Sequence, residues 1–406
     1  MSLDLLIAAR NLKRNGRRSL VALASVAFGV VALLLAGGFI DWNLEFGRES
    51  TIRSQLGHIQ VMPRGAAAAS AADPFAALLP ATSDVMQQIA AEPWLRTLGP
   101  RLAFSGLISH GDSTISFIAE GVSPPAEAEL STAMTFVEGL PLAENEPRGI
   151  VLGKGLAANL GVSVNDTVVL VVNTASGGIN AVECRVRGVF RTITKAYDDV
   201  ALRVPISTAR DLLRTDGSHV WVLLLDRTET TPAALAQLRS RFASHGLEFV
   251  PWTDMADFYK KTAALFGKQV FVVKVIIAMI IVLSVSSTLM MTVLERTGEV
   301  GTALAIGVRR SRILRQFLLE GVLIGLIGGA AGVLLGILLA EAISRIGIPM
   351  PPPPGMDHGY IAGIALSSKL VVDAFLIAAG PALLAALYPA WSASRRPIVD
   401  SLRHNR

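Results

Sequence analysis

The sequence predicts an α-helical membrane protein with four transmembrane helices and a large α+β domain outside the membrane. Three observations support this prediction: 51% of the 406 residues are apolar, only 17% are charged, and four separate stretches reach the length of roughly 20 apolar residues that a bilayer requires. A soluble domain carries roughly 25% charged residues, so this chain has too little charge to cover a surface that faces water on all sides. The composition excludes a disordered chain, and the single cysteine, Cys184, excludes an intramolecular disulfide and a Cys-based metal site.

The apolar stretches predict the organisation of the whole chain. In order, we expect a cytoplasmic amphipathic helix over 1–18, a first span over 19–40, an outer domain over 41–269 with an insertion at about 126–215, a second span over 270–293, an inner loop over 294–316, a third span over 317–343, an outer loop over 344–369, a fourth span over 370–391 and a cytoplasmic tail over 392–406. The first span is too long for the apolar region of a signal peptide, so we expect it to be retained. Pro381 and Pro389 are expected to interrupt the fourth span.

Charge asymmetry predicts the orientation. Residues 1–18 hold five Arg or Lys and one Asp, 295–315 hold five Arg and two Glu, and the tail from Arg395 holds four Arg and one Asp. Residues 41–268 hold 20 cations and 24 carboxylates. Because short basic loops remain in the cytoplasm, we expect both termini and the inner loop inside, and the large domain outside. The net charge of +5 therefore reflects membrane topology, and we expect no nucleic-acid partner.

The N-terminal segment predicts an amphipathic helix. Leu3, Leu6 and Ile7 form an apolar stripe, and basic residues follow it up to the first span. Such a helix can lie in the membrane interface with its cations on anionic headgroups. A simple positive-inside anchor fits the same pattern, and the two interpretations are compatible.

The inner loop combines charges, small residues and a basic cluster. Its distinctive residues are Glu295, Arg296, Gly298, Glu299, Gly301, Ala303 and Gly307. A passive connection between two spans does not need this pattern. We therefore expect a short, rigid elbow that transmits force to a cytosolic partner, with an ordinary connecting loop as the alternative.

Three segments resemble one known family. The stretch ERTGEVGTALAIGVRRSRILRQFLLEG resembles the coupling segment of the FtsX-like, MacB-type ABC permeases, also called type VII ABC transporters. The opening AARNLKRNGRRSLVALASVAFGV and the ending LYPAWSASRRPIVDSLRHN are similar to the first helices and the closing pattern of that family. Gly298 stands where Arg or Lys is usual, and Ser401 where Ala is common. The large outer domain and the stretch LGHIQVMPRG are most similar to lipoprotein-releasing permeases.

The resemblance implies partners and a site. Residues Glu295, Arg296, Glu299, Gly301, Ala303 and Gly307 would contact a groove on a separate ABC ATPase subunit. The sequence contains no G-x-x-x-x-G-K-[ST] phosphate loop, so we expect no enzyme activity and no cofactor in this chain, with ATP and Mg bound by the partner. The family also implies a second permease copy or a homologous permease, membrane lipids, and a periplasmic adaptor or lipoprotein chaperone as a further candidate partner. The expected location is the bacterial inner membrane.

The third span carries two series of glycines spaced four residues apart. One series is Gly321, Gly325 and Gly329, and the other is Gly328, Gly332 and Gly336. Such stripes allow close helix packing, within the protomer or in a dimer contact. Glu320 lies near the inner end of this span, and we expect it to form an ion pair with Arg312, Arg315 or the basic N-terminus.

The outer domain predicts a split ferredoxin-like fold. Strands at 57–62 and 101–109 flank a helix at 82–91, and strands at 219–225 and 247–251 flank a helix at 232–244. Two β-α-β halves separated by a β-rich insertion give this arrangement, which corresponds to a porter-like module in the family. The histidines at 58, 110, 219 and 245 are scattered without metal-ligand spacing, so we expect no enzymatic site here.

The leading functional prediction is a transmembrane permease subunit that couples ATP hydrolysis by a separate ATPase to motion of the outer domain. The resemblance favours lipoprotein or lipid extraction or export in the cell envelope. The alternatives are an efflux-type exporter permease that works with a periplasmic adaptor, and an FtsX-like regulator or membrane sensor scaffold.

Overall fold

The computed structural model describes residues 3–14, 16–66, 73–192, 194–352 and 359–395. The closing family pattern from Pro397 to Arg403 lies outside these residues. The chain divides into two compact units. We call the first the helical bundle (Met1–Glu45, Thr262–Met350 and Ile361–Arg406) and the second the sheet domain (Phe46–Lys261 and Pro351–Tyr360).

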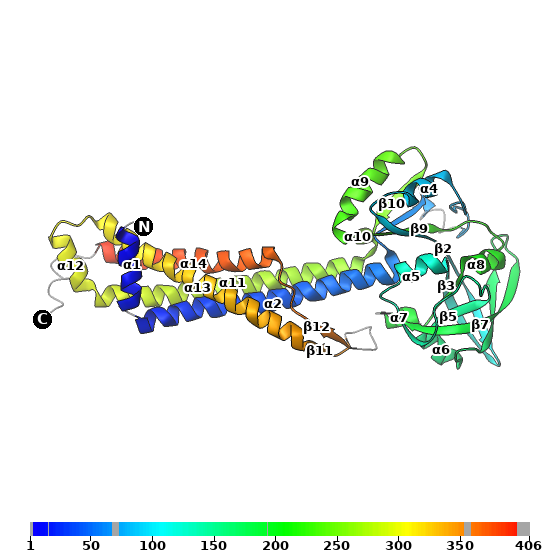
Figure 1. The fold of residues 1–406 in the computed structure, drawn as a ribbon, viewed down its shortest axis with the longest axis horizontal. Helices are drawn as coiled ribbons and strands as arrows, with labels where there is room; N and C mark the ends of the chain where they lie inside the picture. Colours follow the sequence, from blue (N-terminus) through cyan, green and yellow to red (C-terminus); the bar gives the residue numbers. More distant parts are fainter. Residues whose placement is uncertain (1–2, 15, 67–72, 193, 353–358, 396–406) are drawn as a thin grey trace. The chain divides into compact units, whose positions relative to one another are not determined.

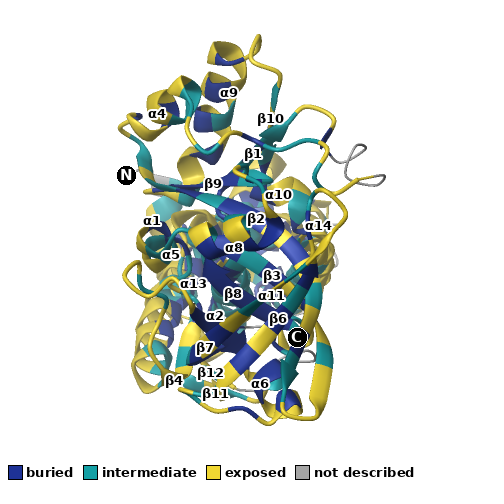
Figure 2. Cartoon of the chain, turned by 90° about the vertical axis from the view of Figure 1, so that its right-hand side faces the viewer, coloured by how far each residue is buried: buried dark blue, intermediate teal, exposed yellow. Residues whose placement is uncertain are grey.

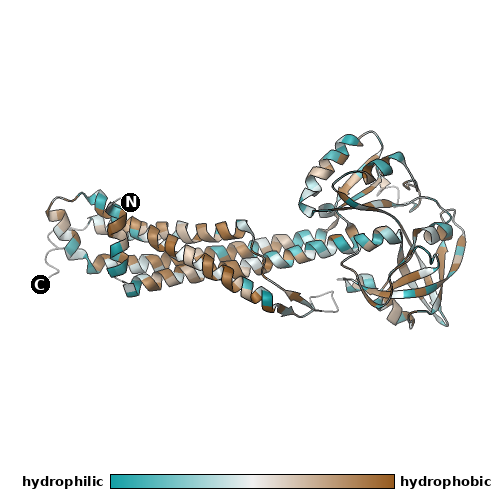
Figure 3. Cartoon of the chain, viewed as in Figure 1, coloured by the Kyte–Doolittle hydropathy of each residue, from teal (hydrophilic) through white to brown (hydrophobic). Residues whose placement is uncertain are grey.

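Among the described residues, six helices belong wholly or largely to the helical bundle (Figure 1). They are α1 (Leu3–Arg14), α2 (Gly16–Thr51), α11 (Asp257–Glu295), α12 (Thr297–Ala305), α13 (Arg310–Ile346) and α14 (Ser368–Arg395). Helices α2, α11, α13 and α14 are long and apolar enough to cross a membrane, which confirms the predicted four-span architecture. Figure 3 shows apolar residues concentrated along these four helices.

The fourth span is not interrupted by its prolines. Helix α14 runs from Ser368 to Arg395 through both Pro381 and Pro389, so the expected break is wrong. Proline is tolerated in membrane helices because neighbouring helices and local adjustments satisfy the freed backbone groups. In agreement with this, Ala382, Ala385 and Ala386 are buried.

The glycines of α13 place two neighbouring helices in close contact. A Cβ atom on Gly321, Gly325 or Gly329 would lie 2.4–2.9 Å from the Cβ atoms of alanines 386, 382 and 378 of α14. A Cβ atom on Gly328, Gly332 or Gly336 would likewise lie 2.9 Å or less from an atom of Val26, Ala27 or Leu34 of α2. Both glycine stripes are therefore covered by helices of the same chain, in contacts that only a residue without a side chain permits.

The sheet domain contains the expected ferredoxin-like half-repeats. The elements are β1 (Ile59–Pro63), α4 (Asp84–Ala90), β2 (Leu95–His110), β9 (Val220–Leu225), α9 (Thr231–Arg241) and β10 (Leu247–Pro251). The strands pair in the order β10-β1-β9-β2, and every neighbouring pair is antiparallel. Each β-α-β half thus receives a strand of the other half between its own two strands, which is the split β-α-β arrangement.

The chain between β2 and β9 extends the same sheet. It holds β3 (Ser113–Val122), which precedes the insertion expected at about 126–215, and then α5 (Pro124–Leu130), β4 (Thr135–Gly139), β5 (Gly149–Gly153), α6 (Lys154–Leu160), β6 (Thr167–Asn173), β7 (Ile179–Arg191), α7 (Lys195–Asp198), β8 (Ala201–Pro205) and α8 (Ile206–Leu213). Strand β2 is long enough to pair with β9 by its first half and with β3 and β6 by its second half. Figure 2 shows buried residues along β2, β3 and β8. The β-rich lobe therefore shares a strand with the ferredoxin-like half-repeats.

Short elements complete the chain. A π-helical turn, η1 (Ile52–Leu56), follows α2, and η2 (Thr228–Thr230) and α10 (Trp252–Met255) lie in the sheet domain. In the outer loop, β11 (Ile348–Met350) and β12 (Tyr360–Ala362) form a two-stranded sheet.

The glycine packing predicts a stability difference between two alanine substitutions. Gly332→Ala would place a Cβ atom 2.7 Å from the carbonyl oxygen of Ala27, so we expect a loss of about 1–3 kcal/mol of stability through overpacking. Gly380→Ala, on α14, meets no atom within 4 Å, so we expect a gain of up to about 1 kcal/mol from helix propensity. Thermal unfolding of the full chain in detergent measures both. Equal shifts for the two variants would contradict the close contact between α13 and α2.

Candidate functional site

The inner loop forms a short helix with one buried and one exposed face. The buried residues of α12 are Thr297, Val300, Gly301 and Leu304. Val300 and Leu304 pack in one apolar cluster with Phe317 of α13 and Ala390 of α14. The helix is therefore held against two of the candidate spans.

The exposed face of α12 lies on the opposite side. Glu295, Glu299, Thr302 and Ile306 are exposed, and we call these four residues the coupling face. Glu299 and Thr302 lie three positions apart on one side of α12, Ile306 is the residue that ends this helix, and Glu295 is the last residue of α11. Ile306, directly after α12, has a large apolar side chain that is 78% exposed. This face is the part of α12 that a partner can reach.

Gly307 ends the helix in a defined way. The backbone N–H of Gly307 donates to the carbonyl of Leu304 at 3.1 Å, and the N–H of Val308 donates to the carbonyl of Ala303 at 3.0 Å. This pair of bonds is a Schellman motif, which satisfies carbonyls at the end of a helix. Gly307 has a φ of +93°, a conformation that favours glycine. Gly307 and Ala303 thus set where α12 stops and how Ile306 is presented.

A buried ion pair attaches the start of α12 to α13. Glu320 is 2% exposed, and its Oε1 accepts hydrogen bonds from Arg296 Nη1 at 2.9 Å and from Asn11 Nδ2 of α1 at 2.8 Å. Arg296 also donates from Nε to Glu299 at 3.1 Å, and its guanidinium lies 5.4 Å from the centre of the Phe317 ring. Glu320 is thus in an ion pair, as expected, but with Arg296; Arg312 instead pairs with Asp4 at 3.2 Å.

Helix α1 supplies charges to the coupling face. Arg14 Nη2 donates to both carboxylate oxygens of Glu299 at 2.8 Å, and Arg18 of α2 pairs with Glu295. The hydrogen bond from Arg14 holds the pKa of the Glu299 carboxyl below its ordinary value, against a smaller opposing effect of burial. Glu299 is therefore an anion at neutral pH that is already bound by a cation of the same chain.

The predicted coupling residues do not all lie on the surface. Glu295, Glu299 and Gly307 are exposed, Ala303 is half-buried, and Arg296 and Gly301 are buried. Arg296 and Gly301 therefore position α12. Sequence reasoning missed Asn11 and Arg14, whose contacts join segments about 300 positions apart. It also missed Thr302 and Ile306, although helical spacing from Glu299 could have found them.

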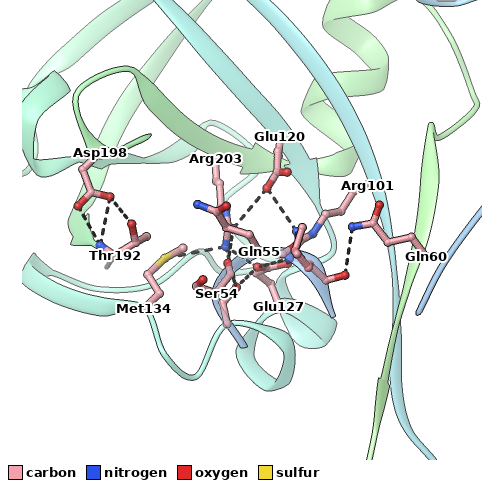
Figure 4. Close-up of polar contacts among 12 residues, drawn as sticks. Ser54, Gln55, Gln60, Arg101, Glu120, Glu127, Met134, Thr192, Asp198 and Arg203 are labelled. Carbon is pink, nitrogen blue, oxygen red and sulfur yellow. Dashed lines mark hydrogen bonds and ion pairs between the residues drawn. The ribbon is translucent and has the colours of Figure 1, made fainter. Parts of the chain in front are cut away.

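The sheet domain contains a second polar cluster, at the end of the helix that continues α2 (Figure 4). The carbonyl of Ser54 in η1 accepts a hydrogen bond from Arg203 Nη2 at 2.9 Å, and the carbonyl of Gln55 accepts one from Arg101. Terminal carbonyls of a helix have no partner within the helix, and cations stabilise that end. Arg101 and Arg203 therefore cap this helix end from strands β2 and β8.

Two carboxylates compensate the capping arginines. Arg101 and Arg203 are 3% and 1% exposed. Arg101 Nη2 lies 3.0 Å from the carboxylate of Glu127, and Arg203 pairs with the same carboxylate. Glu120 lies 3.3 Å from Arg203. Burial by itself raises the pKa of Glu127, but the two guanidinium groups outweigh it and the pKa lies below the ordinary value. The cluster thus fixes the helix end to α5 and the sheet.

Other polar residues of the sheet domain are held in local hydrogen bonds or are buried. Within the described residues, no group of three or more His, Cys, Asp or Glu could hold a metal ion. His58 accepts from the N–H of Leu225 at 3.0 Å, and burial lowers its pKa to about 4. Burial raises the pKa of Cys184 to about 12, so it is a thiol at neutral pH. The Asp198 carboxylate accepts hydrogen bonds from the backbone and side chain of Thr192.

Two family models match the chain. Residues 19–241 match the MacB-like periplasmic core domain, and residues 271–398 match the FtsX-like permease C-terminal domain. Together they cover most of the sheet domain and all or most of each of the four candidate spans. An ABC transporter permease is defined by this combination of features: candidate spans, the short helix α12 between two of them, and a split sheet domain. The chain belongs to the FtsX-like, MacB-type family of ABC permeases.

Individual relatives are similar over different lengths. The lipoprotein-releasing system transmembrane protein LolC of Neisseria meningitidis is 23% identical over 97% of this chain and 96% of its own length. The macrolide export ATP-binding/permease protein MacB of Bordetella avium is 31% identical over 55% of this chain, and the match spans only 34% of that protein. The crystal structure of the periplasmic region of MacB from Actinobacillus actinomycetemcomitans covers 52% of this chain and 95% of its own, at 14% identity and a TM-score of 0.38.

If Arg296 and Glu320 stabilise the protein as an ion pair, a second substitution should recover the stability that the first one loses. Arg296→Met leaves the Glu320 carboxylate buried without its cation, so we expect a loss of about 3 kcal/mol. Adding Glu320→Gln removes the uncompensated charge and keeps an acceptor for Asn11, so most of the loss should be recovered. Thermal unfolding of the full chain in detergent compares the variants. If the double variant is no more stable than Arg296→Met, the two residues do not act as a pair.

Two glutamates of α5 provide a matched test of the capping cluster. Glu127→Gln leaves Arg101 and Arg203 without their main counter-charge, so we expect a loss of about 3–5 kcal/mol. Glu129 forms an exposed pair with Arg96, so Glu129→Gln should cost less than about 1 kcal/mol. Hydrogen exchange of the segment 52–56 reports whether the helix end loosens in the first variant only. Similar exchange in both variants would contradict the capping role.

Proposed function

We propose that this chain is the transmembrane permease subunit of an ABC transporter and is driven by a separate ATPase subunit. The observation that carries the proposal is the coupling face: an exposed side of α12 whose other side is fixed to α13 and α14. A push on an element attached this way is transmitted to the spans rather than absorbed by a flexible loop. The sequence has no phosphate loop, which supports ATP hydrolysis by a partner.

The coupling face suits a groove in a partner protein. Ile306 provides an exposed apolar anchor, and Thr302 and Glu299 lie beside it. Apolar anchors in a pocket, surrounded by polar contacts, provide most of the energy of protein interfaces. Arg14 and Arg18 neutralise Glu299 and Glu295 on the same face, so the partner surface would meet paired charges there rather than a net charge.

The proposed transport acts on lipoproteins or lipids in the cell envelope, with the N- and C-termini in the cytoplasm and the sheet domain in the periplasm. The similarity to LolC over nearly the whole of both chains supports this substrate class. The basic inner segments support the orientation. A second permease, identical or homologous, would complete the transporter, and the apolar faces of α11 supply surface for that contact or for lipid.

A second candidate function is export together with a periplasmic adaptor. The similarity of the larger part of the chain to proteins named for macrolide export favours it. Co-purification of either an adaptor or a lipoprotein chaperone with the complex would distinguish the two functions.

The coupling face predicts which exposed isoleucine binds the ATPase. Ile306→Asp replaces an apolar anchor by a charge, so we expect at least a tenfold loss of ATPase binding, from about 1.5–3 kcal/mol of lost burial. Ile346→Asp changes an isoleucine that is 85% exposed at the other end of α13, and it should leave binding unchanged. Co-purification with the ATPase and ATP hydrolysis by the complex provide the two measurements. Retained binding and activity in Ile306→Asp would refute the proposed role of α12.

A further inference from the structure

The helical bundle contains a hollow of about 290 Å³ between α2, α11 and the start of α14. Its apolar lining includes Ile40, Leu44 and Leu370. Its charged lining consists of Asp41, Lys274, Lys369 and Asp373. The hollow has room for several water molecules, so a polar group the size of a phosphate with a short amino-alcohol tail can enter it.

The charges of the hollow leave one cation and one anion for a ligand. Lys274 Nζ and Asp373 Oδ2 are 2.9 Å apart and neutralise each other. Lys369 is exposed and has no ion-pair partner in the part of the chain that the structure describes. Asp41 is half-buried and interacts electrostatically with both lysines without forming an ion pair within those same residues. The hollow thus presents an ammonium from α14 and a carboxylate from α2.

The position of the hollow indicates its ligand. Asp41 directly follows the first apolar stretch, and Lys369 directly precedes the fourth. These positions mark the level at which the hydrocarbon of the bilayer gives way to headgroups. On the proposed orientation this level belongs to the outer leaflet. A phospholipid headgroup is the charged group that is most concentrated there.

We propose that the hollow binds the headgroup of a zwitterionic phospholipid such as phosphatidylethanolamine. The lipid phosphate pairs with Lys369, and its ammonium pairs with Asp41. Ile40, Leu44 and Leu370 contact the glycerol and the first methylene groups of the acyl chains. The inference deepens the proposed function, since it names the lipid class that the permease holds beside two of its spans.

Native mass spectrometry of the full chain, purified in detergent and titrated with lipid, tests the proposal. The probes are phosphatidylethanolamine, phosphatidylglycerol and diacylglycerol with identical acyl chains. We expect phosphatidylethanolamine to bind best. Lys369→Gln should weaken it about tenfold, the loss expected when one charge-assisted contact is removed from a partly wet site. Asp41→Asn should abolish the preference over phosphatidylglycerol.

Controls separate this site from ordinary interfacial lysines. Lys268 is exposed on α11 near the same boundary and does not line the hollow, so Lys268→Gln should bind lipid as the unaltered chain does. Lys369→Arg keeps the positive charge and should retain lipid binding. Retained binding would show that a substitution at this position leaves the hollow folded. Equal binding of diacylglycerol, tighter binding of phosphatidylglycerol, or unchanged binding in Lys369→Gln would each overturn the proposal. The measurement needs no ATPase, so its failure differs from failure of the coupling experiment with Ile306→Asp.

Discussion

The ion pair between Arg296 and Glu320 is the contact on which the arrangement of α1, α12 and α13 depends. It joins α12 to α13, and Asn11 brings α1 to the same carboxylate oxygen. A buried carboxylate is costly unless it is paired and hydrogen-bonded, so removing any partner creates a strong penalty. This penalty keeps the short helix α12 in one position although it has only nine residues. Without that constraint, the exposed coupling face would have no fixed direction relative to the spans.

Close helix packing holds the bundle together, and continuous strand pairing holds the sheet domain together. Each unit also contains a few buried charges. In the bundle, the glycines of α13 let α2 and α14 approach so closely that no side chain fits between them. In the sheet domain, Arg101 and Arg203 bind the carbonyls that end the extension of α2. Both devices make helix ends or faces rigid, because close packing and satisfied buried charges each allow one geometry only. A displacement at one end of a helix is transmitted to its other end only if the helix is rigid.

Several features could be predicted from the sequence because they depend on local patterns. Apolar length identified the four candidate spans, and alternating strands around helices identified the ferredoxin-like halves of the sheet domain. The charges and glycines of 294–316 predict a short rigid element, but they do not separate its buried face from its exposed face. Arg296 looked like a surface residue because its partner Glu320 lies 24 positions away, on another helix. Prolines 381 and 389 were misjudged because local propensity is overridden where neighbouring helices satisfy the backbone.

The sequence by itself determined the class of protein, since the number of spans and the strand pattern follow from hydrophobicity repeating at fixed intervals. Only the tertiary structure decided which charges meet. Arg14 and Glu299 lie 285 positions apart, and so pair only after α1 and α12 have packed on the same spans. The same is true of Lys274 and Asp373, which come together when α11 meets α14. Periodicity fixes the face of a helix that a residue occupies, but the neighbour on that face depends on how the helices assemble.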